Sequence, residues 1–406
     1  MKNIRILLLT QWFDPEPAYK GLIFAKELKK AGNEVEVVTG FPNYPGGNIY
    51  PGYRIKMLQR KVIDGIKISR VPLYPSHNLS ALGRAFNYIS FALSSFFYGV
   101  FSVRNIDVIY VYDPPMTAAI SAAFIGMIRR IPFVVDINDL WPDTLAATGM
   151  IKNKYLLSSI GKVCLWVYRR SAHVVVVTPG YKKKLIKRGV PEDKIDIIYN
   201  WCDEKALSLP AVINADEYGL DNRFNIVFAG TMGKAQALDS VIRAAKLIET
   251  RHKEVQFVFV GGGIEIESLK KLSQELLLGN VIFIPRLPFS EIGKVLTLAD
   301  ALLVHLKNDP LFEITIPGKL SAYLKVGKPI IMGVKGDAAS VLTQSGAGYC
   351  VLPENEKSIA DAVSKIFKLS QDELDEMGAR GLEYYNKYLS LKIGVEKFIK
   401  VFESVV

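Results

Sequence analysis

Two lysines at predicted helix starts have the chemistry to bind an anion. Lys319 follows Pro317 and Gly318, and proline suits a first helical turn because that turn has no use for the amide hydrogen that proline lacks. A lysine is otherwise disfavoured there, since free N–H groups and the helix dipole make this end of a helix positive. The segment 313–329 therefore indicates a negative ligand, although it is equally compatible with an ordinary surface helix before a buried strand.

A second basic turn lies at residues 229–236. Gly230 and Gly233 let the backbone approach a phosphate, and Lys234 adds a mobile cation ahead of an expected helix. Lys234 and Lys319 fall on the same edge of one predicted sheet, so we expect them to bind one diphosphate. None of the glycine turns is a G-x-G-x-x-G fingerprint or a G-x-x-x-x-G-K-[ST] phosphate loop, which weakens dinucleotide and nucleoside triphosphate interpretations.

The elements that must position these residues alternate short β-branched runs with longer helical stretches, which is typical of parallel α/β layers. In such open sheets ligands bind at the carboxyl ends of the strands. The predicted strands are residues 4–9, 34–38, 66–71, 108–111, 133–136 and 174–178, followed by 226–229, 256–260, 281–284, 301–305 and 329–332. The two series predict an α/β protein with two Rossmann-like domains.

The length of 406 residues also exceeds what one core usually organises. We expect an N-terminal Rossmann-like domain at residues 1–205, a C-terminal Rossmann-like domain at 206–388, and a final helix at 389–406. The domains are expected to join within residues 191–222. The final helix carries apolar residues at helical spacing, so one face must pack on another element, and the N-terminal domain is the expected one.

The net charge of +11 is concentrated in the first half, where residues 1–205 hold 28 Lys and Arg against 16 Asp and Glu. Such asymmetry indicates a polyanion, either nucleic acid or an acidic membrane face. Aromatic residues do not interleave with the basic clusters as in a nucleic-acid module, so no nucleic acid is expected.

Residues 85–103 are expected to form a helix at a membrane interface, with a helix of the protein core as the alternative. The basic clusters at residues 169–170 and 182–188 fit anionic lipid or a solvated face.

Composition and termini indicate a cytoplasmic protein. Half of the residues are apolar and 22% are charged, which is ordinary for a soluble globular chain. Cys164, Cys202 and Cys350 have no metal-ligand or redox spacing, which favours buried thiols in a reducing compartment. The first ten residues hold too short an apolar run for a signal peptide and are expected to form a strand.

Several further motifs carry a resemblance to a known family. In the second half these are residues 228–239, 260–263, 285–288, 299–304 and 319–329, and together they resemble a retaining glycosyltransferase of family 4 with the GT-B fold. In the first half, residues 11–16, 39–47, 139–143 and 200–201 are similar to the bacterial polysaccharide subgroup that includes WbuB-like N-acetyl-L-fucosamine transferases. The resemblance covers essentially the whole chain and implies two Rossmann-like domains facing across a cleft. It implies an acceptor-binding N-terminal domain at residues 1–205 and a nucleotide-sugar-binding C-terminal domain at 206–388.

The resemblance implies roles for individual residues. Asp139 occupies a position that faces the donor sugar in the family, although it also fits a helix N-cap ahead of Leu140. The family places two glutamates eight positions apart, where this chain has Ile314 and Ala322, with Glu313 one residue early. Ser321 or Tyr323 is then left to hold the ribose. The implied sets are Lys234, Glu313 and Asp139 for catalysis; Gly21, Gly230, Gly233, Lys234, Thr315, Gly318 and Lys319 for the diphosphate; Arg286, Leu287 and Ser321 for nucleobase and ribose; and Trp12, Asn43 and Tyr44, with the loop 41–47, for the acceptor.

The implied activity is transfer, with retention, of a deoxy-amino sugar such as N-acetyl-L-fucosamine from a UDP-sugar to a lipid-diphosphate-linked glycan in O-antigen or capsule synthesis. No cofactor and no metal are expected, since no Asp-x-Asp motif occurs and lysines can stabilise the leaving diphosphate. The enzyme is expected on the inner face of the cytoplasmic membrane, with its N-terminal domain on anionic lipid. A GT-B nucleotide-sugar epimerase and a non-catalytic nucleotide-sugar-binding protein remain as alternatives.

Overall fold

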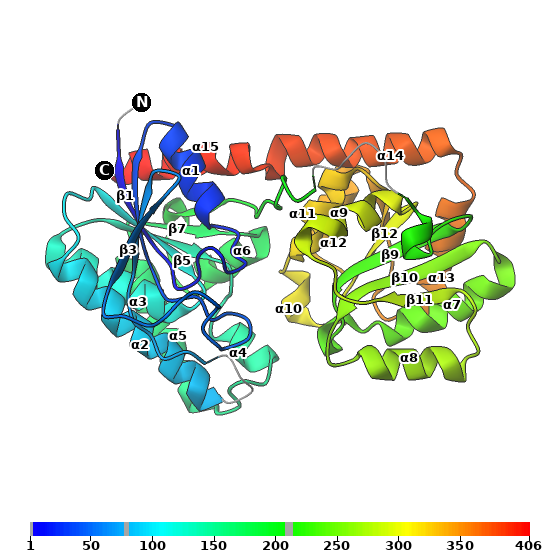
Figure 1. Cartoon of the computed structure of the whole chain (residues 1–406), viewed down its shortest axis with the longest axis horizontal. Coiled ribbons are helices and arrows are strands. Elements are labelled where there is room, and N and C mark those ends of the chain that lie inside the picture. The colour runs from blue at the N-terminus through cyan, green and yellow to red at the C-terminus, as the bar shows by residue number, and fades with distance from the viewer. Residues whose placement is uncertain (1–2, 77–80, 208–213) are drawn as a thin grey trace. The chain divides into compact units, whose positions relative to one another are not determined.

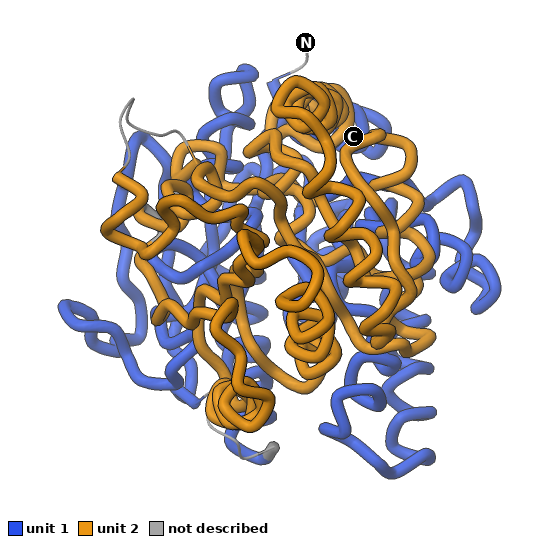
Figure 2. The backbone as a smooth tube through the Cα atoms, turned by 90° about the vertical axis from the view of Figure 1, so that its right-hand side faces the viewer, with its two compact units in different colours: residues 1–199, 394–406 blue, residues 200–393 orange. Residues whose placement is uncertain are grey.

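The chain forms two compact units, which Figure 2 shows in different colours. The computed structural model describes residues 3–76, 81–207 and 214–406. Unit 1 is Met1–Tyr199 with Gly394–Val406, and unit 2 is Asn200–Ile393. The segment 191–222, where the domains are expected to join, includes residues 208–213, which lie outside the described residues.

Unit 1 is built on a sheet with the order β3-β4-β2-β1-β5-β6-β7-β8. All neighbouring strands in it are parallel except β3 and β4, which pair antiparallel. The central strands are buried along their whole length, as expected when helices cover both faces. The strands are β1 Arg5–Leu9, β2 Glu34–Thr39, β3 Gln59–Ile63, β4 Ile66–Arg70, β5 Val108–Asp113, β6 Phe133–Ile137, β7 His173–Val176 and β8 Ile195–Ile197.

The helices of unit 1 connect these strands, and the last helix of the chain joins them (Figure 1). They are α1 Leu22–Lys30, α2 Ala81–Phe101, α3 Met116–Arg129, α4 Asp143–Ala147, α5 Lys154–Arg170, α6 Pro179–Lys187, the 3-10 turn η1 Glu192–Lys194, and α15 Leu391–Val405. In α15, Phe398 packs with its ring centroid 5.1 Å from that of Phe24 and 5.3 Å from that of Tyr110. The apolar face of α15 therefore completes the core of unit 1.

Unit 2 contains a parallel sheet with the order β11-β10-β9-β12-β13-β14. The strands are β9 Phe224–Thr231, β10 Val255–Gly262, β11 Val281–Ile284, β12 Ala301–His305, β13 Ile330–Gly333 and β14 Gly348–Cys350. From β9 the chain first adds strands on one side and then, from β12, on the other. The strand order thus reverses between β9 and β12, and such a switch point is where open α/β sheets bind ligands.

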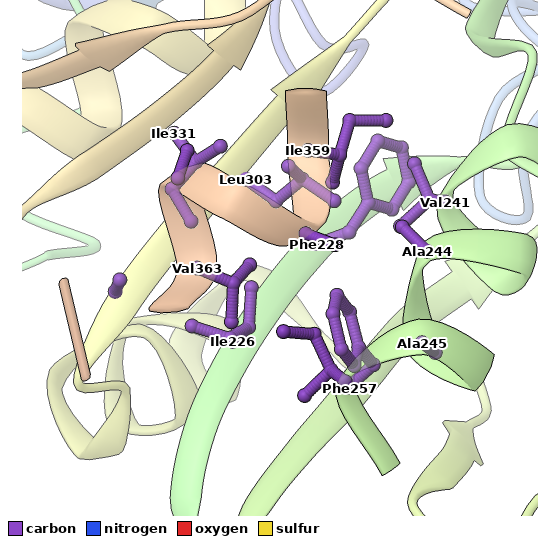
Figure 3. Packing of buried hydrophobic residues seen from close by; sticks show 14 of the residues in the cluster. Ile226, Phe228, Val241, Ala244, Ala245, Phe257, Leu303, Ile331, Ile359 and Val363 are labelled. Atoms are coloured by element: carbon purple, nitrogen blue, oxygen red, sulfur yellow. The ribbon is translucent and has the colours of Figure 1, made fainter. Parts of the chain in front are cut away.

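The helices of unit 2 enclose this sheet. They are η2 Asp216–Tyr218, η3 Lys234–Gln236, α7 Asp239–Arg251, α8 Ile266–Glu275, α9 Phe289–Leu298, α10 Pro310–Glu313, α11 Gly318–Val326, α12 Asp337–Ser345, α13 Glu356–Phe367, α14 Gln371–Tyr384 and the π-helical turn η4 Tyr385–Leu389. Figure 3 shows the core on one face, where Phe228 and Phe257 of the sheet meet Val241 of α7 and Val363 of α13. This packing holds β9 rigidly beneath the glycine turn that follows it.

The predicted α/β class is confirmed, and each predicted strand is present. The sequence did not predict β3, β8 and β14. The central residues of β3, Arg60, Lys61 and Val62, are exposed at the edge of the sheet, so no apolar alternation marks the strand. The other two strands have three residues each, too few to show a period.

Candidate active site

Two glycine turns in unit 2 are packed against each other at the carboxyl ends of β9 and β10. A Cβ added to Gly261 would lie 2.1 Å from the carbonyl oxygen of Gly230, and one added to Gly263 would lie 2.2 Å from that of Met232. All three glycines also have positive φ angles, of 141° at Gly230, 139° at Gly261 and 156° at Gly263. At Gly261 and Gly263 both the space and the backbone conformation exclude a side chain, and at Gly230 the backbone conformation disfavours one.

The turn that carries Lys234 is a single 3-10 turn, and the long helix α7 begins only at Asp239. The side-chain oxygen of Gln236 accepts a hydrogen bond from the Gly233 amide at 3.0 Å, which closes the turn. Lys234 itself is exposed. The expected helix start is therefore displaced by five residues, while Lys234 stays on the ligand edge of the sheet.

His305, the last residue of β12, anchors this turn from below. Its Nδ1 lies 2.7 Å from the carbonyl oxygen of Gln236, and its Nε2 accepts a hydrogen bond from the Glu354 amide at 3.0 Å. Accepting at Nε2 and donating at Nδ1 requires the neutral ring, and burial lowers the pKa of His305 accordingly. The histidine is thus a packed structural residue.

Lys319 extends from the first turn of α11 to the glycine turn after β9. Its Nζ lies 3.4 Å from the centroid of the Phe228 ring, and it is 3.1 Å from where a Cβ of Gly230 would stand. The ammonium group is buried and has no hydrogen-bond partner among the described residues. Burial lowers the pKa of Lys319 to about 7. Such a group gains much from an anion, because only the aromatic face now compensates its charge.

Two neighbours of Lys319 on α11 serve to hold the helix. Tyr323 is fully buried and accepts a hydrogen bond from the Ala229 amide at 2.9 Å, which ties α11 to β9. The Ser321 hydroxyl is buried and donates to the carbonyl oxygen of Asn200 at 2.7 Å. Both hydroxyls are therefore already engaged, which does not favour the ribose contact predicted for Ser321 or Tyr323.

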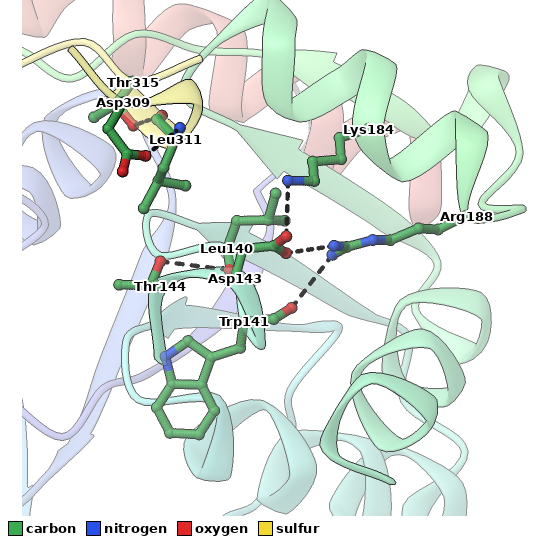
Figure 4. A network of polar contacts seen from close by, with 9 residues as sticks. All are labelled: Leu140, Trp141, Asp143, Thr144, Lys184, Arg188, Asp309, Leu311 and Thr315. Atoms are coloured by element: carbon green, nitrogen blue, oxygen red, sulfur yellow. Dashed lines mark hydrogen bonds and ion pairs between the residues drawn. The ribbon is translucent and has the colours of Figure 1, made fainter. Parts of the chain in front are cut away.

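The segment before α11 is shaped by backbone contacts. Asp309 caps α10 through the Leu311 amide at 2.9 Å, and the Thr315 hydroxyl donates to the Leu311 carbonyl at 2.8 Å (Figure 4). A Cβ added to Gly336 would lie 1.9 Å from the carbonyl oxygen of Glu313, so a close backbone approach fixes this residue. The Glu313 side chain remains exposed.

Arg286 and Leu287 lie in the loop after β11, at the outer edge of the unit 2 sheet. Arg286 is exposed and Leu287 is half-buried. Two strands separate this edge from β12, so these residues do not join the Lys319 cluster. Unit 2 therefore brings together Gly230, Gly233, Lys234 and Lys319, with Gly318 at the start of α11.

In unit 1, the predicted acceptor residues lie in an aromatic cluster. Trp12, after β1, stacks on Tyr44, after β2, with ring centroids 4.5 Å apart, and Tyr88 of α2 meets Trp12 edge-on at 6.5 Å. Both Trp12 and Tyr44 are half-buried, so part of each ring faces outward. Asn43 is different, because it is 1% exposed and its amide is bonded to Phe41 and Asn87.

Glu16 holds the loop that carries Tyr44. Its carboxylate is buried and accepts hydrogen bonds from the amides of Phe13, Asn43 and Tyr44. Burial raises the pKa of Glu16 to about 7, although those amides oppose the shift. No sequence pattern singles out this carboxylate, because its burial depends on a loop 27 residues away.

Asp139 follows β6 and is half-buried. Burial raises the pKa of Asp139. Burial also raises the pKa values of Tyr44 and Tyr88, and the charge of Asp139 adds to both shifts. It therefore belongs to the same end of the sheet as the aromatic cluster. The alternative that Asp139 caps a helix is wrong, because α4 begins at Asp143 and has Pro142 at its N-cap.

The carboxylate of Asp14 binds the N-terminal end of α1. Asp14 Oδ2 accepts a hydrogen bond from the Leu22 amide at 2.6 Å, and a Cβ added to Gly21 would lie 2.3 Å from the same oxygen. An internal anion thus occupies the position at which Gly21 was predicted to approach a phosphate. This arrangement does not favour a diphosphate contact at Gly21 unless Asp14 moves.

Sequence reasoning missed two buried charged residues in unit 1. Lys20 is fully buried, its Nζ lies 5.5 Å from the Phe398 ring centroid, and burial lowers its pKa to about 8 while Asp136 opposes the shift. Asp113 ends β5 with neither carboxylate oxygen hydrogen-bonded among the described residues, and burial raises its pKa well above the ordinary value. Only the position of Asp113, two residues after the predicted strand 108–111, could have indicated it.

Part of the predicted basic cluster is paired within unit 1. Asp143 accepts from Lys184 at 2.7 Å and forms an ion pair with Arg188, which also reaches the carbonyl oxygen of Trp141 (Figure 4). Burial tends to raise the pKa of Asp143, but these two cations together outweigh it and lower the pKa. The cluster at residues 182–188 therefore holds α6 to the start of α4 and is not a simple solvated face.

Both halves of the chain match known protein families. The family described as "Glycosyl transferase 4-like domain" matches residues 24–201, and "Glycosyl transferases group 1" matches residues 214–383. A protein of Escherichia coli named for colanic acid biosynthesis glycosyl transfer, WcaI, is 26% identical over 84% of this chain and 86% of its own length. The protein WbjE of Pseudomonas aeruginosa, named as a glycosyltransferase, is 24% identical over 64% of this chain and 66% of its own.

Solved structures share the fold at low identity. Anabaena Alr3699/HepE in complex with UDP-glucose is 15% identical, with a TM-score of 0.72 over 99% of this chain and 100% of that one. An Escherichia coli protein solved with UDP-2-fluoro glucose is 12% identical, with a TM-score of 0.74 over 99% of both chains. The chain is therefore a glycosyltransferase of the GT-B fold, with a family 4-like N-terminal half and a group 1 C-terminal half.

Proposed function

We propose that this enzyme is a retaining glycosyltransferase that moves a deoxy-amino sugar, such as N-acetyl-L-fucosamine, from a UDP-sugar to a lipid-diphosphate-linked glycan. The glycan would belong to an O-antigen or a capsule. The polysaccharide context is supported by the name of the relative WcaI, and the donor type by the UDP and UDP-sugar bound in HepE. The sugar and the acceptor come from the sequence resemblance alone.

The buried ammonium group of Lys319 is the observation that carries the proposal. It lies beside the Gly230 turn at the switch point of the unit 2 sheet, and it has no hydrogen-bond partner among the described residues. Lys234 extends into solvent from the adjoining turn. A diphosphate placed on the Gly230 backbone would accept hydrogen bonds from Lys319 and, after a side-chain rotation, from Lys234.

These two lysines also suit the chemistry of glycosyl transfer. The bond from the sugar to the diphosphate breaks as negative charge accumulates on the leaving phosphate oxygens. Cations fixed beside those oxygens stabilise the transition state more than the bound donor, which is what catalysis requires. We propose that the transition state resembles an oxocarbenium ion and that the departing phosphate takes the proton of the acceptor hydroxyl.

The remaining candidate residues are assigned to donor binding in unit 2 and to acceptor binding in unit 1. In unit 2 we assign the diphosphate to Gly230, Gly233 and Lys319, with Glu313 as a candidate group near the sugar. In unit 1 we assign the acceptor to the exposed sides of Trp12 and Tyr44, with Asp139 as the candidate catalytic carboxylate beside them. No metal is part of this mechanism.

A panel of nucleotide sugars tests the proposal. The protein is incubated with each sugar, with and without a polyprenyl-diphosphate-linked glycan, and released UDP and sugar products are measured. UDP release that requires the acceptor, with a product of unchanged anomeric configuration by NMR, is the expected result. Isomerised sugar without acceptor would identify an epimerase, and binding without turnover a nucleotide-sugar-binding protein; either would overturn the proposal.

A further inference from the structure

Helix α2 carries a continuous apolar stripe on its exposed side. Its members recur every three or four residues and are between 51% and 73% exposed: Leu82, Phe86, Ile89, Leu93, Phe97 and Phe101. This spacing places them on one side of the helix. The opposite side packs inward, with Phe91 fully buried and the Ser95 hydroxyl 2.9 Å from that of Ser121 on α3.

Ring contacts extend the stripe across two more helices. Phe96 of α2 packs on Phe97 with centroids 5.2 Å apart, and its centroid is 6.3 Å from that of Phe124 of α3. Phe124 in turn lies 5.5 Å from Trp166 of α5. Figure 1 shows the three helices side by side on one face of unit 1. We call the α2 stripe, Phe124 and Trp166 the α2–α3–α5 face.

All charges on the three helices are positive. Helices α2, α3 and α5 contain no Asp or Glu, whereas they contain Arg84, Arg129, Lys154, Lys162, Arg169 and Arg170. Lys154, Lys162 and Arg170 are exposed. Unlike Lys184 and Arg188 of α6, which pair with Asp143, these three cations have no ion pair within the described part of the chain. These three side chains can therefore bind an anion outside the protein.

A hollow beside Trp166 is lined by both apolar and cationic side chains. It has a volume of about 430 Å³ and is lined by Leu165 and Trp166 together with Lys162, Arg169 and Arg170. An apolar wall next to three cations suits the region where a lipid headgroup joins its acyl chains, because tryptophan prefers that depth and lysine and arginine reach phosphate from it.

We propose that the α2–α3–α5 face docks this enzyme on an anionic membrane leaflet. The aromatic and aliphatic side chains of α2 enter the boundary between headgroups and acyl chains, and the cations of α5 contact lipid phosphates. The helices lie along the membrane in this arrangement. None of the described helices is long and apolar enough to cross a bilayer.

The positive charge of the α2–α3–α5 face favours an anionic lipid surface over a second copy of the chain as its partner. A symmetric dimer through this face would bring two sets of cations together with no carboxylate on the same helices to compensate them. An anionic leaflet supplies both the negative charge and the apolar environment. The inference rests on the proposed function, since a lipid-linked acceptor gives the enzyme a reason to meet a membrane.

Vesicle co-sedimentation tests the inference with the full chain. Vesicles contain phosphatidylcholine alone or with phosphatidylglycerol added, and UDP-glucose affinity is measured for every variant as a check on folding. The apolar variant combines Leu93→Gln, Phe97→Gln and Phe101→Gln. Its control changes three apolar residues outside the face that are between 57% and 86% exposed, Met57→Gln, Leu277→Asn and Leu352→Gln. A charge variant combines Lys154→Gln, Lys162→Gln and Arg170→Gln, and its control is Lys271→Gln, Lys357→Gln and Lys392→Gln.

We expect the wild type and both controls to bind the anionic vesicles and the apolar variant to bind at least about tenfold more weakly. The charge variant should lose the preference for anionic over neutral vesicles. Equal binding by the apolar variant and its control would overturn the inference. So would dimerisation of the wild type in sedimentation equilibrium that the apolar variant abolishes, if vesicle binding is absent. If the wild type binds vesicles but does not bind UDP-glucose, the result would contradict the proposed function and leave the membrane inference intact.

Discussion

The Nζ atom of Lys319 lies 3.4 Å from the centroid of the Phe228 ring. The ring belongs to β9 and the lysine to α11, so the contact joins the strand that ends in the Gly230 turn to the helix beside it. A buried ammonium group that an aromatic face alone compensates is costly without an anion. The relationship therefore predicts that Lys319 opposes stability in the free protein and supports donor binding.

Lys319→Met should weaken the binding of UDP-glucose by roughly tenfold to a hundredfold, because a charge-assisted hydrogen bond to a diphosphate is lost. The same change should raise the thermal midpoint of the ligand-free protein at pH 6 by a few degrees, since the methionine has no charge to bury. Calorimetric titration and thermal denaturation measure the two effects. Lys325→Met, at the other end of α11, is the control and should leave donor affinity unchanged. An unaltered affinity in Lys319→Met would contradict the assignment.

Donor affinity should fall as pH rises through about 7, the pKa to which burial lowers Lys319. The protonated amine binds the diphosphate, so raising the pH from about 6.5 to 9 removes the binding form and weakens affinity by roughly one to two orders of magnitude. UDP-glucose is the suitable ligand because its diphosphate has no terminal phosphate that titrates near pH 6. Lys319→Met should flatten the profile. A profile of equal slope in that variant would assign the titration to another group.

The pKa of Lys319 also sets a pH dependence of stability in the absence of donor. Because the folded value is lowered, the unfolded chain binds more protons between pH 7 and the ordinary lysine value, and stability rises with pH across that window. Below pH 7 both states are protonated and the cost of burial is fully present. Urea denaturation at several pH values should show this rise in the wild type and a smaller one in Lys319→Met.

Gly261→Ala should destabilise unit 2 by about 2 kcal/mol or more, because the new Cβ would meet the Gly230 carbonyl and the φ angle is unfavourable for alanine. Displacing Gly230 should also weaken UDP-glucose binding. Gly262→Ala provides a matched control, since a Cβ there meets nothing within 4 Å. We expect the control to stay within about 0.5 kcal/mol of the wild type by urea denaturation. Equal effects of the two changes would show that the close approach at Gly261 does not matter.

Asp139→Asn should lower the rate of sugar transfer by about a hundredfold or more, because the carboxylate charge no longer stabilises the oxocarbenium-like transition state, with UDP-glucose affinity unchanged. Asp143→Asn, at the start of α4, should have the opposite effects. It removes the partner of Lys184 and Arg188 and so should lower stability while transfer persists. Steady-state kinetics with both variants separate the two roles. A normal rate in Asp139→Asn would remove this carboxylate from the catalytic set.

Local sequence features were sufficient for the fold and for part of the site. The β-branched runs predicted parallel strands because the central strands, such as β5, β6 and β12, are buried over their whole length, and this leaves a signal within a few residues. The turns at Gly230 and Gly261 were likewise visible, since a positive φ angle selects glycine at the position itself. The edge strand β3, whose central residues are exposed, left no such signal.

Contacts between distant segments were decided only by the tertiary structure. Ser321 looked free to bind a ribose until Asn200 proved to accept its hydrogen bond, and Gly21 looked open to a phosphate until Asp14 proved to occupy that end of α1. Lys319 was predicted to face an anion from its place in a first turn, which is a local property. Its burial over Phe228, and hence its pKa, depends on a strand 91 residues earlier in the chain, because desolvation is a property of the surroundings and not of the residue type.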